Sequence, residues 1–335
     1  MGWLEQPMRW LRNKGSGLVV AGREGTRVTD AVPPVYLDFP ACVAREYTEW
    51  FPIAWQAIDD ILAVIRGVDF TPLERRSPAL KGYAWDGYLR CSAIRMVRAA
   101  RALHTKEAGT RCLLDYGSYF GNFALMFARL GYEVHAADSY REYGQALAPV
   151  AALLKENGVT VYDTTPLLDE RGDLFMDRYG LYDVVLSVGV IEHIPHTPRL
   201  YLETLDRLLK PSGTLVLDTP NLAYLYTRQK LARGETMFCP IERQYETQLP
   251  FEGHHREYTV EEMRWMLERL GHENIWIDTF NYSIYGAEVL SGQDAMNFRQ
   301  MASDPSTREV ILTVSRKAPV AASAAGRSDR GIAAP

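Results

Sequence analysis

The chain has 335 residues, of which 47% are hydrophobic and 24% charged, and its formal net charge is −5. The negative charge disfavours a nucleic acid partner, because binding to phosphates needs clustered lysine and arginine. No apolar stretch reaches the length of a membrane span, and the first residues lack the apolar region of a signal peptide, so we predict a cytoplasmic protein with no membrane span. The four cysteines are scattered without the spacing of a metal site, which agrees with a reduced compartment. They are Cys42, Cys91, Cys112 and Cys239.

Helical periodicity dominates the first hundred residues. Apolar side chains recur at helical spacing over residues 42–65, where Pro52 is expected to kink or restart the helix. A second helix is predicted over residues 88–103, directly before the first strand of the next region. We therefore predict a helical accessory or substrate-cap region over residues 1–106.

Residues 113–131 combine a short buried strand, a glycine turn and an amphipathic helix. The apolar run ends at Asp115, and Gly117 and Gly121 allow the tight turn that a closely approaching ligand needs. The helix is predicted to begin near Asn122. An α/β protein builds a nucleotide-type pocket from elements in this order.

The next strand ends at Asp138, about 20 residues after the glycine turn. Rossmann-like folds place the acid that binds ribose hydroxyls at this distance, so the spacing predicts an adenosine-type cofactor. A dinucleotide site is normally written G-x-G-x-x-G, but Tyr119 stands at the middle glycine position, where its ring would obstruct a pyrophosphate. This departure favours S-adenosylmethionine over NAD.

Further strand-like segments follow in order. Residues 182–196 read as the fourth strand with its loop, residues 209–221 as a helix end, glycine turn and fifth strand, and residues 273–280 and 307–317 as the last two strands. From about residue 113 to about residue 317 the chain resembles the class I S-adenosylmethionine-dependent methyltransferases. The resemblance implies an α/β fold with a Rossmann-like, seven-stranded, mostly parallel sheet and an antiparallel last strand. The corresponding methyltransferase domain covers residues 107–318.

The resemblance also implies which residues bind S-adenosylmethionine. Asp115 matches the acid of the family's first motif, and Gly117 and Gly121 match its glycines. Asp138 matches the ribose-binding acid, for which the alternative is a turn acid after a strand. Asp163 is expected either near the adenine amino group or in a plain turn. The predicted cofactor-binding set is completed by Ser118, Ser139 and Val188.

An insertion over residues 222–255 follows the fifth strand and is the predicted lid. Its aromatic and basic side chains suit a sugar, an aromatic ring or an anionic substrate. A surface lid with solvated charges is an equal alternative. Residues 319–335, rich in small residues, are predicted to form a disordered tail.

Two hypotheses compete for the chemistry, because the sulfonium already activates the methyl group and the enzyme mainly aligns the displacement and removes a proton. In the first, a neutral histidine takes the proton, with His254 or His255 preferred and His193 as a further candidate. In the second, Glu192, His193 and His254 bind a divalent cation, Mg²⁺ or Mn²⁺, that lowers the pKa of the acceptor hydroxyl. These three match the ligands of the small-RNA 2′-O-methyltransferases, but Gly189 replaces the first glutamate of that set.

Several other polar residues have structural interpretations. Thr259 and Glu262 are spaced as a capping box, which would fix the start of the helix after the histidine pair. His135, within a buried strand, and His272, at a strand entry, are predicted to be hydrogen-bonded core histidines, and His196 a loop residue.

We predict a methyltransferase for biosynthesis, with a small-molecule or carbohydrate acceptor that offers a hydroxyl rather than an amine. Residues 219–221 and 254–259 resemble segments of methyltransferases of sugar and polysaccharide biosynthesis, which supports this acceptor class by association. Metal-assisted RNA 2′-O-methylation and a non-catalytic cofactor-binding scaffold are the alternatives. The oligomeric state stays open, a homodimer included.

Overall fold

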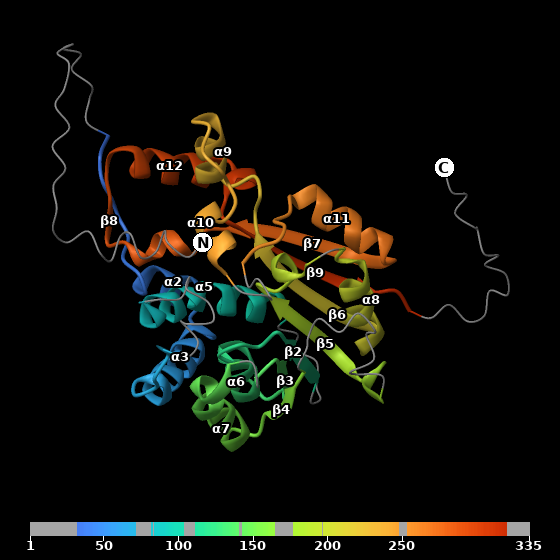
Figure 1. Ribbon diagram of the computed structural model, residues 1–335. Coiled ribbons are helices and arrows are strands. Elements are labelled where there is room, and N and C mark those ends of the chain that lie inside the picture. Colours follow the sequence, from blue (N-terminus) through green and yellow to red (C-terminus); the bar gives the residue numbers. More distant parts are fainter. Residues whose placement is uncertain are drawn as a thin grey trace, which may run out of the picture.

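The computed structural model describes residues 32–71, 82, 84–103, 111–140, 143–164, 177–195, 197–247 and 253–319. The predictions for His196 and for the tail from residue 320 onward lie outside these residues. Within them, seven strands form one sheet in the order β4-β3-β2-β5-β6-β9-β7 (Figure 1). A separate two-stranded pair, β1-β8, is described below.

The large sheet has the predicted mostly parallel character. Its strands are β2 (Cys112–Tyr116), β3 (Glu133–Asp138), β4 (Thr160–Asp163), β5 (Tyr182–Val188), β6 (Leu209–Pro220), β7 (His272–Phe280) and β9 (Val310–Lys317). Neighbours from β4 to β6 run parallel, whereas β9 is antiparallel to both β6 and β7. The predicted fold class is therefore confirmed. The carboxyl ends of the parallel strands share one edge, where ligands of such sheets bind.

Alternate strand residues pack against two layers of helices. Leu113 and Leu186 belong to the cluster with α3, α5, α6 and α7, whereas Leu114 and Val185 belong to the cluster with α8 and α11. The helices are α3 (Phe51–Ile65), α5 (Trp85–Leu103), α6 (Asn122–Arg129), α7 (Ala148–Glu156), α8 (Arg199–Leu208) and α11 (Val260–Arg269). Both sheet faces are covered, as a parallel sheet requires. None of the described helices is both long and apolar enough to cross a membrane.

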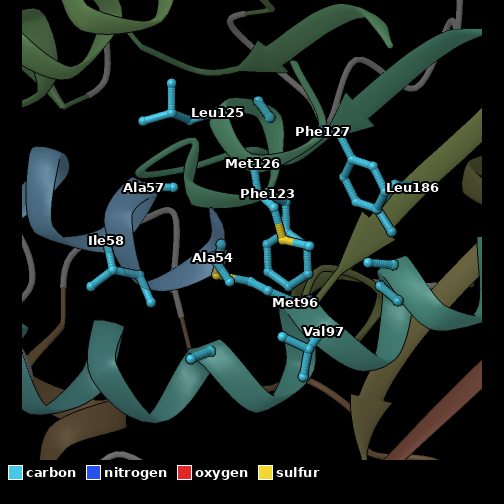
Figure 2. Close-up of a cluster of buried hydrophobic side chains, with 14 of the residues drawn as sticks. Ala54, Ala57, Ile58, Met96, Val97, Phe123, Leu125, Met126, Phe127 and Leu186 are labelled. Carbon is cyan, nitrogen blue, oxygen red and sulfur yellow. The ribbon is translucent and has the colours of Figure 1, made fainter. Parts of the chain in front are cut away.

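The N-terminal helices share the core of the first layer. Figure 2 shows its centre, with labelled side chains from α3, α5, α6 and β5. These are Ala54, Ala57, Ile58, Met96, Val97, Phe123, Leu125, Met126, Phe127 and Leu186. Full burial of each larger side chain stabilises the fold by about 1.5–3 kcal/mol. Helices α3 and α5 are thereby held against the elements that carry the glycine turn.

The predicted long N-terminal helix is interrupted. Helix α2 (Ala41–Glu46) ends before α3 begins at Phe51, and Pro52 lies in the first turn of α3. A proline is tolerated there because the first N–H groups of a helix have no partner within the helix. Pro52 therefore restarts the helix, which was one of the two predicted outcomes.

A smaller apolar cluster joins segments far apart in the sequence, and sequence patterns did not predict it. Strand β1 (Val35–Tyr36) pairs antiparallel with β8 (Val289–Leu290). Helix α12 (Gly292–Ser303) packs there beside α9 (Leu225–Ala232), which belongs to the insertion after β6. The insertion also contains α10 (Ile241–Glu246). Short 3-10 turns complete the described elements: Gly144–Leu147, Ile191–His193, Ser283–Gly286 and Pro305–Thr307.

Two histidines are buried and hydrogen-bonded, as predicted. Nδ1 of His135 lies 2.9 Å from the hydroxyl of Tyr182 in the buried interior. His272 places Nδ1 2.8 Å from Oγ of Ser315 and Nε2 3.1 Å from Oδ1 of Asp206. Hydrogen bonds of this kind offset the cost of burying a polar ring.

Candidate functional site

The glycine turn between β2 and α6 lies at the carboxyl edge of the sheet. The backbone N–H of Gly117 donates to the carbonyl of Ala137 at 2.8 Å, which ties the turn to β3. Gly117 has a φ of +81°, and a Cβ atom there would lie 2.3 Å from Cγ2 of Val190. Both the backbone conformation and the close approach therefore require glycine.

Asp115 supports the start of α6 from the neighbouring strand. Its Oδ2 accepts a hydrogen bond from the N–H of Ala124 at 3.1 Å. This interaction supplies a cap, because the N-cap residue Gly121 has no side chain to do so. Burial, with the nearby charge of Asp138, raises the pKa of Asp115 to about 8.

The raised pKa predicts how the Asp115→Asn variant depends on pH. Between about pH 4 and pH 8 the folded protein keeps a proton on Asp115 that the unfolded chain releases, so this carboxyl costs about 1.4 kcal/mol of stability per pH unit as the pH rises. Asparagine cannot ionise and can still accept the Ala124 hydrogen bond. We expect urea denaturation to show that the free energy of unfolding of the variant, relative to that of the wild type, increases as the pH rises from about 4 to about 8. A difference that does not change with pH would contradict the prediction.

Asp138 ends β3 with a buried carboxyl group that neutral donors surround. Its Oδ2 accepts from the N–H of Tyr119 at 2.7 Å, and its Oδ1 from the N–H of Ser139 at 2.6 Å. Tyr143 adds a side-chain hydrogen bond. Burial raises the pKa of Asp138. A carboxylate held this way, without a basic residue among these donors, has the chemistry that ribose hydroxyls need.

Tyr119, which replaces the middle glycine, lies in an aromatic group beside this carboxyl. Its φ is +47°, an uncommon backbone conformation for a residue other than glycine. Its ring centroid lies 5.2 Å from that of Tyr143 and 6.1 Å from that of Trp85, at the start of α5. The N-terminal region therefore reaches the glycine turn through Trp85.

The other residues predicted to bind the cofactor lie along the same carboxyl edge of the sheet. Oγ of Ser118 lies 2.7 Å from the hydroxyl of Tyr140. Asp163 ends β4 in register with Asp138, and its side chain is exposed. Val188 ends β5. The fold thus gathers the predicted set at the carboxyl ends of β2 to β5, while their contacts with a cofactor stay a prediction.

Two histidines and a glutamate converge beyond β5. Each of Glu192, His193 and His254 offers one potential ligand atom, and these atoms lie within 4.8 Å of one another. The rings of His193 and His254 meet edge to face, with centroids 4.8 Å apart. Burial raises the pKa of Glu192 to about 8. Its Oε2 accepts from the hydroxyl of Thr219 at 3.3 Å.

His254 is oriented by a partner that sequence patterns did not single out. Nδ1 of His254 lies 2.9 Å from Oε1 of Glu257, which is itself buried. With Nδ1–H donating to this carboxylate, Nε2 carries the lone pair. Burial lowers the pKa of His254 to about 3, so the ring is neutral at physiological pH. The three-residue spacing of His254 and Glu257 in the sequence His-His-Arg-Glu could have indicated this pair.

His255, the other preferred base, contacts Glu192 through its backbone. Its side chain is exposed, and its backbone N–H donates to the carbonyl of Glu192 at 2.7 Å. The predicted capping box at the start of α11 is present: Glu262 Oε2 accepts from the N–H of Thr259 at 2.9 Å, and Thr259 Oγ1 from the N–H of Glu262 at 3.3 Å. The backbone contact at His255 and the cap at Thr259 thus hold the segment that follows His254.

A buried ion pair lies near Glu192, and sequence patterns did not predict it. Arg95 of α5 binds Asp218 of β6 through two hydrogen bonds, one of them 3.0 Å from Nε to Oδ2. A Cβ atom at Gly189 would lie 3.0 Å from Nη2 of Arg95 and 3.6 Å from Oε1 of Glu192. The guanidinium therefore occupies the space that a glutamate at position 189 would need.

A model of a methyltransferase domain family matches residues 85–276, which is more than half of the chain. The chain belongs to this methyltransferase family. The match confirms the resemblance predicted from the motifs. It begins at Trp85, so it includes α5 of the N-terminal region as well as the sheet through most of β7.

Curated relatives of this methyltransferase domain include two enzymes named ubiquinone biosynthesis O-methyltransferase. The one from Pectobacterium atrosepticum is 31% identical over 153 residues, which cover 46% of this chain and 54% of the relative. The one from Rickettsia conorii is 31% identical over 109 residues, covering 32% and 35%. The chain thus spans about a third to a half of the length of these relatives.

Solved structures with a similar arrangement are also methyltransferases. An S-adenosylmethionine-dependent methyltransferase from Archaeoglobus fulgidus has a TM-score of 0.45 and 17% identity, over 67% of this chain and 93% of that one. Phosphoethanolamine N-methyltransferase 2 of Haemonchus contortus, solved with S-adenosylmethionine, has a TM-score of 0.42 and 15% identity, over 67% and 52%.

Proposed function

We propose that this protein transfers a methyl group from S-adenosylmethionine to a hydroxyl group of a small molecule, with sugars and glycans among the acceptors. Membership of the methyltransferase family supports the reaction class, and the O-methyltransferase relatives support a hydroxyl acceptor. When bound, the cofactor supplies a methyl group activated by its sulfonium. The buried, neutral-donor environment of Asp138 fits the ribose of that cofactor.

The observation that carries the proposed chemistry is the pair His254 and Glu257. Glu257 holds Nδ1, so Nε2 of His254 can accept the proton that the acceptor hydroxyl loses on methylation. Burial lowers the pKa of His254, so its ring is neutral before the reaction, and the Glu257 carboxylate can stabilise the imidazolium that forms when the proton is taken. His193 lies against the same ring and narrows the space in which the hydroxyl is placed.

The lid supports a small ring-containing acceptor. The insertion begins beside the histidine segment, because Asn221 bridges to Tyr258 and the N–H of Leu222 donates to the Tyr258 carbonyl at 2.9 Å. It presents Phe238 and Tyr245 with 58% and 83% of their surfaces exposed. Exposed aromatic faces of this kind stack on sugars and aromatic rings.

A divalent cation held by Glu192, His193 and His254 is the second candidate, supported by the convergence of their ligand atoms. Such a cation would lower the pKa of the acceptor hydroxyl. The Arg95 guanidinium beside Glu192 opposes a second positive charge, and Gly189 supplies no fourth ligand. We therefore favour proton transfer to His254.

The test uses S-adenosylmethionine labelled in its methyl group, with catechol and a methyl glucoside as probe acceptors. We expect labelled methyl ether, and we expect the rate to survive a chelator such as EDTA. Loss of the activity in EDTA and its return with Mn²⁺ or Mg²⁺ would replace the proton-transfer proposal with the cation. Cofactor binding without transfer to any hydroxyl acceptor would instead support a scaffold.

A further inference from the structure

A second cluster of metal-ligating side chains lies at the opposite edge of the sheet. Cys112 begins β2, and Glu133 and His135 lie on the first half of β3. One potential ligand atom from each of these residues lies within 4.8 Å of the other two. Asp115 and Asp138, at the far ends of the same two strands, belong to the candidate cofactor site.

The sheet register explains why these side chains meet. Cys112 is the partner of Glu133, and His135 follows two residues later on the same strand. Residues two apart on a strand point to the same face, and directly paired residues on adjacent strands are neighbours. The thiol, the carboxylate and the imidazole therefore share one face of β2 and β3, although their linear spacing is unlike that of any metal-binding motif.

Neighbouring groups orient the imidazole toward the other two. Nδ1 of His135 lies 2.9 Å from the hydroxyl of Tyr182, while Nε2 lies 3.7 Å from Oε1 of Glu133. Metal-binding histidines typically use one ring nitrogen for the metal and fix the ring through the other. The partner Tyr182 is fully buried on β5, so the ring is held from the interior of the fold.

The burial of the cluster allows both stability and access. Cys112 and His135 are 9% and 8% exposed, whereas the Glu133 side chain is 64% exposed. An ion can therefore enter from the solvent side and be covered by the glutamate. Two nearby cationic side chains have partners outside the cluster. Lys210 is bound by both oxygens of Asp183 at 2.9 Å, and Arg178 lies over the ring of Tyr162 at 4.2 Å.

We propose that Cys112, Glu133 and His135 bind a divalent transition metal of the zinc class. Thiolate, imidazole and carboxylate are the ligands that Zn²⁺ takes in proteins, and three of them leave one position for water. On binding, the Cys112 thiol releases its proton to solvent as its sulfur bonds to the metal. The ion links β2 to β3 at the ends opposite the candidate cofactor site.

Cobalt is the probe, because Co²⁺ occupies zinc sites and absorbs light through thiolate-to-cobalt charge transfer. We expect the full chain to bind one equivalent of Co²⁺ with this absorption, and Zn²⁺ to displace it. The Cys112→Ser variant should lose the absorption, and Glu133→Gln should bind Co²⁺ at least about tenfold more weakly. Bound Zn²⁺ should also raise the melting temperature of the wild type more than that of Glu133→Gln.

Two controls separate this cluster from the rest of the molecule. Cys239→Ser removes a thiol outside the cluster, and Glu192→Gln alters the other convergent group, which contains no sulfur; both should keep the cobalt absorption. Glu133→Gln changes an exposed side chain, so it decides the matter if Cys112→Ser fails to fold. Absence of the absorption in the wild type, its persistence in Cys112→Ser, or unchanged affinity in Glu133→Gln would overturn the proposal.

Discussion

Replacing His254 with alanine is expected to lower kcat for methyl transfer by about 10²–10⁴-fold while leaving S-adenosylmethionine affinity unchanged, because general-base catalysis contributes on that scale. The variant removes the imidazole that Glu257 orients. The measurement is transfer of labelled methyl to catechol and to a methyl glucoside, with cofactor binding followed by calorimetry.

His255→Ala is the matched control, because it removes a neighbouring imidazole with an exposed side chain and keeps the backbone contact with Glu192. Its kcat should stay within a few-fold of the wild type. The pH profile gives a further check: with the pKa of His254 lowered to about 3, the rate should show no loss at the ordinary histidine pKa of about 6.5. Full activity in His254→Ala, or equal losses in both variants, would contradict the assignment.

Local patterns were sufficient to predict the sheet and the glycine turn. Gly117 and Gly121 both adopt positive φ angles, and α6 begins at Asn122, as the residue types require. Asp138 lies at the end of its strand because the apolar run stops there. Each of these features depends on residues close together in the chain, which is why the sequence sufficed for them.

Features that depend on contacts between distant residues were missed. The pair Arg95 and Asp218 joins residues 123 positions apart, and neither neighbourhood resembles an ion-pair motif. The pairing of β1 with β8 joins residues even farther apart in the chain, and strands of two residues leave no periodic signal. Cys112 illustrates the same limit: its position relative to Glu133 follows from strand register, which linear spacing does not encode.

The surroundings of His254 are built from elements that lie far apart in the sequence. Glu192 follows β5, His254 precedes α11, and Arg95 comes from the N-terminal helix α5. The ion pair with Asp218 anchors α5 over β6, so the N-terminal region contributes directly to the shape of the candidate active site.

Asp138→Asn is expected to weaken S-adenosylmethionine binding by about 10- to 150-fold, because hydrogen bonds to a charged group contribute about 1.5–3 kcal/mol. The substitution keeps the size of the side chain but removes an acceptor oxygen that ribose hydroxyls would use. Calorimetry on the folded variant measures the change, and circular dichroism checks that the turn held by the N–H groups of Tyr119 and Ser139 is retained.

Asp163→Asn is the control for this variant, because Asp163 is paired with Asp138 in the sheet register but is exposed at the end of β4. We expect its cofactor affinity to stay within a few-fold of the wild type. A larger loss in Asp163→Asn than in Asp138→Asn would move the ribose contact to β4. Equal and unchanged affinities would remove both carboxylates from the cofactor site, since a charged acceptor that touches the ribose cannot be neutralised without a cost.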